Sequence, residues 1–172
     1  MIVWFQRIES AVTRAAIAVA ALLLAVSAAL AIYQVWTRYV AGMPSTWSEV
    51  AIRSMMIWAV FLTAPYAFKT GAMIGVELIY RLVPRGMMIG IYLLVSVVCV
   101  VFLVVLAWQG YSMMLRVQNQ NLAGLFISIA YVYAAIPVGA VLSIFSVISR
   151  AIDVWRDPEG HLLIVDPKAS AT

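Results

Sequence analysis

The chain alternates long uncharged stretches with short polar ones, and this pattern predicts four membrane-spanning helices. A helix needs roughly 20 mostly apolar residues to cross the hydrocarbon core of a bilayer. The stretches that satisfy this requirement lie at residues 15–37, 47–68, 87–114 and 122–149. We therefore expect an all-α integral membrane protein, with one four-span membrane domain over residues 1–150 and a polar tail over 151–172.

The residues before the first predicted span, 1–14, mix apolar and charged side chains at helical spacing. This spacing suits a short helix lying in the membrane interface, and a frayed terminus fits it equally well. The basic start and the small residues at 27–31 would also suit a cleaved signal peptide. However, the apolar core of a signal peptide runs about 7 to 15 residues, whereas the run at 15–37 is longer. We therefore predict that this run is the first span.

The second predicted span begins at a polar segment that resembles a helix start. Thr46 and Glu49 have the spacing of a capping box, in which the first residue caps the helix and the acid reaches back from the third position. The spacing predicts that the helix begins near Trp47.

Charge placement in this span brings one arginine close to the hydrocarbon region. The uncharged run between Arg53 and Lys69 would be about 22 Å long as a helix, which is shorter than the roughly 30 Å hydrocarbon core. A helix over residues 47–68 is about 33 Å long and fits the core. It places Glu49 and Arg53 in its first two turns, four residues apart on one face.

Two interpretations of the Glu49 and Arg53 pair remain open. The pair either stabilises the helix surface modestly at the interface, or it forms an intramembrane ion pair that locks this helix to another helix or to a partner subunit. Large side chains continue at spacings of three and four along one side of the same helix: Trp58, Phe61, Pro65 and Phe68. Such a stripe indicates either packing and lipid contact or a helix partner.

The segment after Lys69 predicts a connecting loop with a short interfacial helical part, because glycines interrupt the helical pattern. Glu77 and Arg81 again stand four residues apart within it. In the fourth predicted span, Pro137 and Gly139 are expected to kink the helix.

Counting lysines and arginines on the two sides of the membrane predicts the orientation. Eight basic residues fall on the side of the termini: Arg7, Arg14, Lys69, Arg81, Arg85, Arg150, Arg156 and Lys168. Three fall on the other side: Arg38, Arg53 and Arg116. We therefore expect both the N-terminus and the C-terminus to be cytoplasmic.

The composition excludes several classes of function. The chain is 66% hydrophobic and 10% charged, which leaves no room for a soluble catalytic domain. Its net charge of +4 is too small and too scattered for a nucleic-acid partner. Cys99 and His161 each stand alone, so we expect no metal cluster, no haem ligation and no nucleophile–base pair. The sequence therefore predicts neither an enzyme nor a cofactor.

Transport chemistry is also missing from most of the spans. The central parts of the first, third and fourth spans contain no ionisable residue, although autonomous transporters usually keep such groups near the midplane. A stand-alone small exporter or channel, and an anchor subunit of a membrane redox complex, remain as alternatives. A small four-span exporter needs an acidic residue inside its first span, and residues 15–37 contain none. An anchor that carries haem needs ligands such as histidine inside the spans, and the single histidine, His161, lies in the polar tail.

An ordered set of residues resembles a known family. Its members here are Trp47, Glu49, Arg53, Trp58, Phe61 and Leu62, then Gly71, Met73, Ile74, Val76 and Glu77, then Leu82 and Pro84, and finally Tyr131, Ile136, Pro137, Val138 and Gly139. The set resembles the small membrane subunit, of DctQ type, of tripartite ATP-independent periplasmic (TRAP) transporters. The resemblance covers nearly the whole chain.

The resemblance implies a scaffold in the bacterial inner membrane. A large TRAP membrane subunit would carry the substrate and sodium sites, and a periplasmic substrate-binding protein would deliver the substrate. This chain would contact those proteins and membrane lipids. The candidates for subunit contact or structural roles are Trp47, Glu49, Arg53, Trp58, Phe61, Gly71, Glu77, Arg81, Pro84 and Pro137.

Overall fold

The computed structural model of the chain describes residues 2–43, 45–70, 85–122 and 127–156. Its helices are α1 (Ile2–Tyr39), α2 (Thr46–Thr70), α4 (Arg85–Arg116), α5 (Ala130–Tyr133) and α6 (Ala135–Arg156). Four segments are long and apolar enough to cross a membrane: Glu9–Tyr39, Thr46–Phe68, Gly90–Arg116 and Ala130–Ile152. The prediction of an all-helical protein with four long apolar helices is confirmed.

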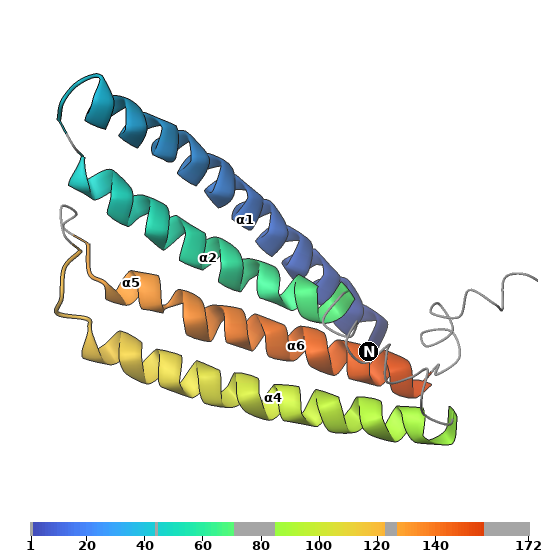
Figure 1. Ribbon diagram of the computed structural model, residues 1–172. Helices are drawn as coiled ribbons and strands as arrows, with labels where there is room; N and C mark the ends of the chain where they lie inside the picture. The colour runs from blue at the N-terminus through green and yellow to red at the C-terminus, as the bar shows by residue number, and fades with distance from the viewer. Residues whose placement is uncertain (1, 44, 71–84, 123–126, 157–172) are drawn as a thin grey trace, which may run out of the picture.

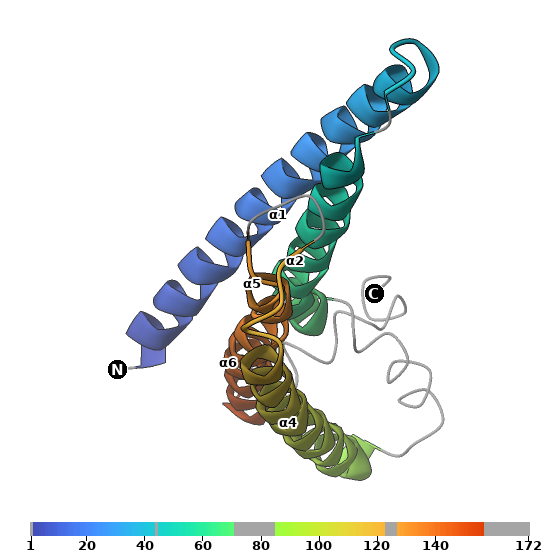
Figure 2. The ribbon, with the colours of Figure 1, turned by 90° about the vertical axis from the view of Figure 1, so that its left-hand side faces the viewer.

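The long helices lie side by side in one layer, in the order α1, α2, α6, α4 (Figure 1). Seen from the side, α1 is inclined against the row formed by the other three (Figure 2). The layer is open, so only 17% of the most apolar window of α1, α2 or α4 is buried, against 39% for α5 and α6. Most of the apolar surface therefore faces outward, where lipid or another protein must cover it.

Glycines let α6 approach both of its neighbours in the layer closely. A Cβ atom added at Gly139 would lie 2.6 Å from the backbone oxygen of Phe61 on α2. A Cβ atom added at Gly110 on α4 would lie 2.6 Å from the Cγ2 atom of Ile136. Because lipid gives little hydrophobic drive for helix association, such close backbone contacts contribute much of the packing.

The N-terminal residues differ from the expected arrangement. No separate interfacial helix precedes the first span, because the described residues 2–14 continue directly into the rest of α1. The mixture of apolar and polar side chains over residues 2–14 therefore belongs to one long helix.

The start of the fourth long helix also differs from the predicted residue 122. The described residues 120–122 and 127–129 pair with each other: the Leu122 amide donates to the Ile127 carbonyl, and the Ile129 amide donates to the Gln120 carbonyl. An apolar hairpin and the first turn of an apolar helix have similar hydropathy, so the pattern alone could not separate them. At the other end, α6 continues to Arg156, and residues 157–172 of the predicted tail lie outside the described residues.

The predicted capping box of α2 is wrong in its residues. The helix begins at Thr46, one residue earlier than expected. Ser45 and Ser48 make the polar contacts here: the Ser45 hydroxyl donates to the Ser48 hydroxyl, which donates to the Ser45 carbonyl. The carboxylate of Glu49 accepts a hydrogen bond from Arg53 instead. A charged donor one turn away forms a stronger hydrogen bond than a neutral backbone amide.

Candidate interaction site

The ion pair near the start of α2 lies on the surface of the chain. The Nη2 atom of Arg53 donates to the Oε1 atom of Glu49 over 2.5 Å, and these side chains are 74% and 51% exposed, respectively. Within the described residues, the pair therefore joins α2 to itself and not to another helix. Its guanidinium and carboxylate remain accessible to a partner or to lipid head groups.

Trp47 connects the start of α2 to the end of α1. The centroid of its ring lies 6.2 Å from that of the Tyr33 ring, at an interplanar angle of 43°. Trp36 and Tyr39, near the same end of α1, are exposed. Aromatic side chains of this kind gather where a membrane meets water, so this end of the layer has the composition of an interface.

Trp58 holds the interrupted start of the fourth long helix. Its indole Nε1 donates to the backbone carbonyl of Tyr131 in α5, over 3.0 Å. The helix is interrupted at Ala134, between α5 and α6. Pro137 lacks an amide as well, but the carbonyl that this affects belongs to Tyr133 and not to Tyr131. A broken helix in a membrane needs other donors for its carbonyls. The structure therefore brings Trp58 to α5, whereas Pro137 lies against Gly110 of α4.

The rest of the predicted stripe on α2 also packs within the chain. Phe61 lies against Gly139, and Pro65 is fully buried. Phe68 packs on a small core formed by residues of α4 and α6. The stripe therefore faces α5 and α6, although Trp58 and Phe61 keep part of their surface accessible. The remaining candidates Gly71, Glu77, Arg81 and Pro84 lie outside the described residues.

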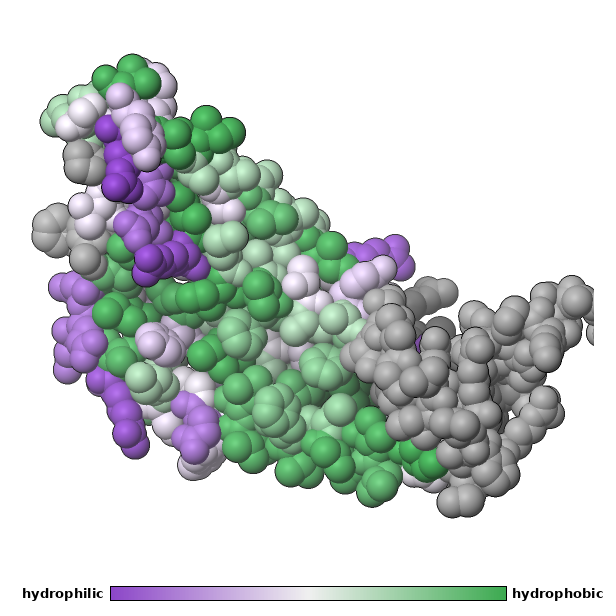
Figure 3. Space-filling view, in the orientation of Figure 1, coloured by the Kyte–Doolittle hydropathy of each residue, from purple (hydrophilic) through white to green (hydrophobic). Residues whose placement is uncertain are grey.

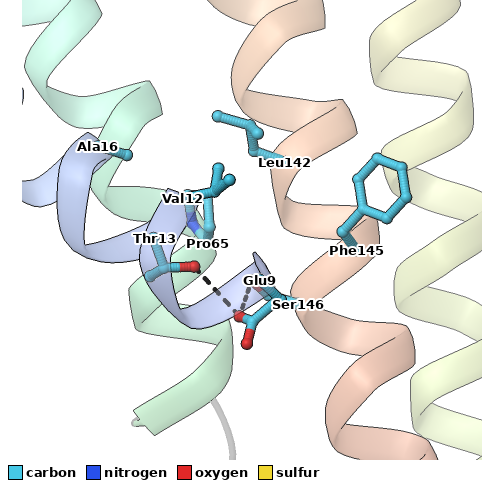
Figure 4. Close-up of a pocket in the computed structure, with 8 residues that line it drawn as sticks. All are labelled: Glu9, Val12, Thr13, Ala16, Pro65, Leu142, Phe145 and Ser146. Atoms are coloured by element: carbon cyan, nitrogen blue, oxygen red, sulfur yellow. Dashed lines mark hydrogen bonds between the residues drawn. The ribbon is translucent and has the colours of Figure 1, made fainter. Parts of the chain in front are cut away.

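Sequence reasoning missed a buried carboxylate on α1. Glu9 is only 6% exposed, and its Oε1 atom accepts hydrogen bonds from Thr13 (3.1 Å) and from Ser146 on α6 (3.0 Å) (Figure 4). These residues border a cavity of about 200 Å³. The four-residue spacing of Glu9 and Thr13 was the only local signal, because Ser146 comes 137 residues after Glu9.

The remaining surface is largely apolar. Figure 3 shows a broad hydrophobic face over the long helices, with hydrophilic side chains gathered at the end of the layer where α1 turns into α2 and α4 ends. Among the described residues, no group of three or more histidine, cysteine, aspartate or glutamate side chains could hold a metal ion. The described part of the chain therefore offers a broad apolar face with polar side chains at one end.

A comparison with protein families gives one match that covers most of the chain. The matching family model is described as "Tripartite ATP-independent periplasmic transporters, DctQ component". It matches residues 27–157, which are 131 of the 172 residues. A search among curated proteins found no significant match. The matched stretch includes α2, α4, α5 and α6 and the second part of α1, whereas Glu9 and Thr13 precede it.

Proposed function

The chain belongs to the DctQ family, the small membrane component of TRAP transporters, and we propose that it is a scaffold for the large membrane subunit. As a DctQ component, it is a multi-pass protein of the bacterial inner membrane and a transporter subunit, not an enzyme. In the proposed arrangement, the large subunit carries the substrate site and couples transport to sodium.

The absence of charge from the middle of the spans is the observation that carries this proposal. No charged residue lies between Arg14 and Arg38, between Arg53 and Lys69, or between Arg116 and Arg150. Solutes and ions that cross a membrane usually meet ionisable groups or broken helices near the midplane. The break between α5 and α6 lies next to the start of the fourth candidate span, away from its centre. Transport chemistry is therefore assigned to another chain.

The open layer supports the scaffold role. The chain buries little of its own apolar surface, and both outer helices of the layer, α1 and α4, expose large side chains along most of their length. Such a layer offers wide faces to another membrane protein and to lipids. The exposed Glu49–Arg53 pair gives one of its ends a polar contact of defined geometry.

The orientation and the third component are further parts of the proposal. With both termini cytoplasmic, the polar segments at residues 39–46 and 116–121 face the periplasm. They would help to dock a periplasmic substrate-binding protein.

Purification with the genomic neighbours tests the proposal. We expect a tagged copy of the chain to recover a much larger multi-span membrane protein, and we expect liposomes that contain this chain alone to show no uptake. Uptake by the chain alone would refute the scaffold role, as would failure to recover any large membrane subunit under conditions that keep the chain folded.

A further inference from the structure

The buried carboxylate of Glu9 lies where the N-terminal part of α1 meets α6. We propose that Glu9 is a positioning residue, which fixes this part of α1 on α6 by accepting hydrogen bonds from Thr13 and Ser146. Among the residues whose burial the structure describes, Glu9 is the one acidic residue that is buried. Ser146 and Thr13 are buried as well, at 1% and 5% exposure, so the three polar groups exclude solvent together.

The direction of the Ser146 hydrogen bond distinguishes it from most other hydroxyls on the long helices. Hydroxyls on all the long helices donate to carbonyls of their own helix: Ser27, Ser54, Thr63, Ser96 and Ser143. Ser146 instead donates across to α1. A hydroxyl that bonds within its helix adds nothing to helix association, whereas the Ser146 bond exists only while α1 and α6 are together.

Packing between these two helices is weak, so the polar contact has a large share in holding them together. α1 packs mainly along α2 and has far fewer neighbours on α6. Between them lies the cavity of about 200 Å³, whose walls include Val12, Ala16 and Leu142 (Figure 4). Atoms that face a cavity lose the dispersion contacts that a filled interface would make. In a membrane, the hydrophobic effect does not compensate for that loss.

Removing the acceptor would leave buried donors behind. The hydroxyls of Thr13 and Ser146 would then donate to carbonyls of their own helices, as the other helix hydroxyls do, so the hydrogen bond that joins α1 to α6 would be lost. Glu9 and Thr13 precede residues 27–157, the stretch matched by the family model, whereas Ser146 lies within it. The contact therefore attaches the unmatched part of α1 to the matched part of the fold, and this inference does not depend on the scaffold role.

A buried cysteine reporter tests the proposal in the full-length chain. Ala16 is 7% exposed on the wall of the cavity, so Ala16→Cys in a Cys99→Ala background is protected from a maleimide while α1 is docked. The alkylation rate in detergent micelles follows the fraction of molecules in which α1 has opened. We expect Ser146→Ala and Glu9→Leu to raise this rate about 3- to 30-fold, the range expected for loss of an interhelical hydrogen bond.

Three variants separate this role from general destabilisation. Ser143→Ala removes an equally buried hydroxyl from the same helix, but one that bonds to Gly139 of α6 itself, so the rate should stay near that of the parent. Glu9→Gln keeps an acceptor oxygen, so its alkylation rate should also stay near that of the parent. The double variant Glu9→Leu with Ser146→Ala should open no more than Glu9→Leu, because both changes remove the same bond.

The natural Cys99, alkylated in chains without the Ala16 reporter, monitors the contact between α4 and α6. Its rate should not change in these variants if only α1 opens. The proposal is overturned if Ser146→Ala has no effect at position 16, if Ser143→Ala accelerates alkylation equally, or if Glu9→Gln behaves like Glu9→Leu. It is likewise overturned if the Cys99 rate rises in parallel with the rate at position 16. Failure of the scaffold role would appear only in co-purification and would leave these rates unchanged.

Discussion

Replacing Gly139 with alanine should push α2 and α6 slightly apart and so destabilise the protein. The added Cβ atom would lie 2.6 Å from the backbone oxygen of Phe61 and 2.7 Å from its Cβ atom, whereas ordinary contacts begin at 3.4 Å. The helices must therefore move apart by about 0.8 Å, which is 3.4 minus 2.6. Rotating the Phe61 side chain would not relieve the contact, because the added Cβ atom meets the backbone oxygen of Phe61. Overpacking of this kind costs about 1–3 kcal/mol.

Gly90→Ala is the matched control for this substitution. Gly90 also lies in a long helix, but a Cβ atom there would meet nothing within 4 Å. Both variants gain the same helix propensity, so this contribution cancels when the two are compared. We expect Gly139→Ala to be less stable than Gly90→Ala by about 1–3 kcal/mol in detergent-induced unfolding followed by tryptophan fluorescence. Equal stability of the two variants would refute the close contact between α2 and α6.

Three further predictions concern the polar contacts and the topology. Trp58→Phe should lower the stability of the isolated chain by about 0.5–1.5 kcal/mol in the same assay, because the Tyr131 carbonyl loses its indole donor; no loss would contradict that role. Arg53→Ala should change that stability by no more than about 0.5 kcal/mol, since its pair with Glu49 is exposed, yet it should reduce recovery of the large subunit in co-purification. Unchanged recovery would show that the pair makes no contact with the partner. An alkaline phosphatase fusion at Thr172 should be inactive in a bacterial host, and an active fusion would reverse the predicted orientation.

The ends of the predicted spans show where hydropathy predicts a helix boundary well and where it does not. For α2, the predicted range 47–68 and the observed helix Thr46–Thr70 agree closely, because a charged or polar residue stands near each end. For the fourth helix, the start was misplaced because residues 122–129 are nearly as apolar as the helix that follows them. Hydrogen bonds between the described residues 120–122 and 127–129 satisfy part of the backbone in another way.

The candidate site was predictable only where its contacts are local. The pair of Glu49 and Arg53 follows from a spacing of four residues, and the structure shows that contact. The contact of Trp58 with Tyr131 joins residues 73 positions apart, and no spacing rule connects them. The mixed side chains of residues 1–14, which include Glu9, predicted an interfacial helix or a frayed terminus, whereas the burial of Glu9 depends on a distant serine.

The sequence by itself determined the class of the protein, its four long apolar helices and its family. Hydropathy is sufficient for this purpose because a spanning segment must satisfy its own backbone and match the bilayer thickness, and both requirements act along the chain. The tertiary structure alone decided the order α1, α2, α6, α4, the close approach at Gly139 and the burial of Glu9 against Ser146. These features depend on which helix faces lie together, and in lipid that choice rests on shape and on single hydrogen bonds, to which hydropathy is insensitive.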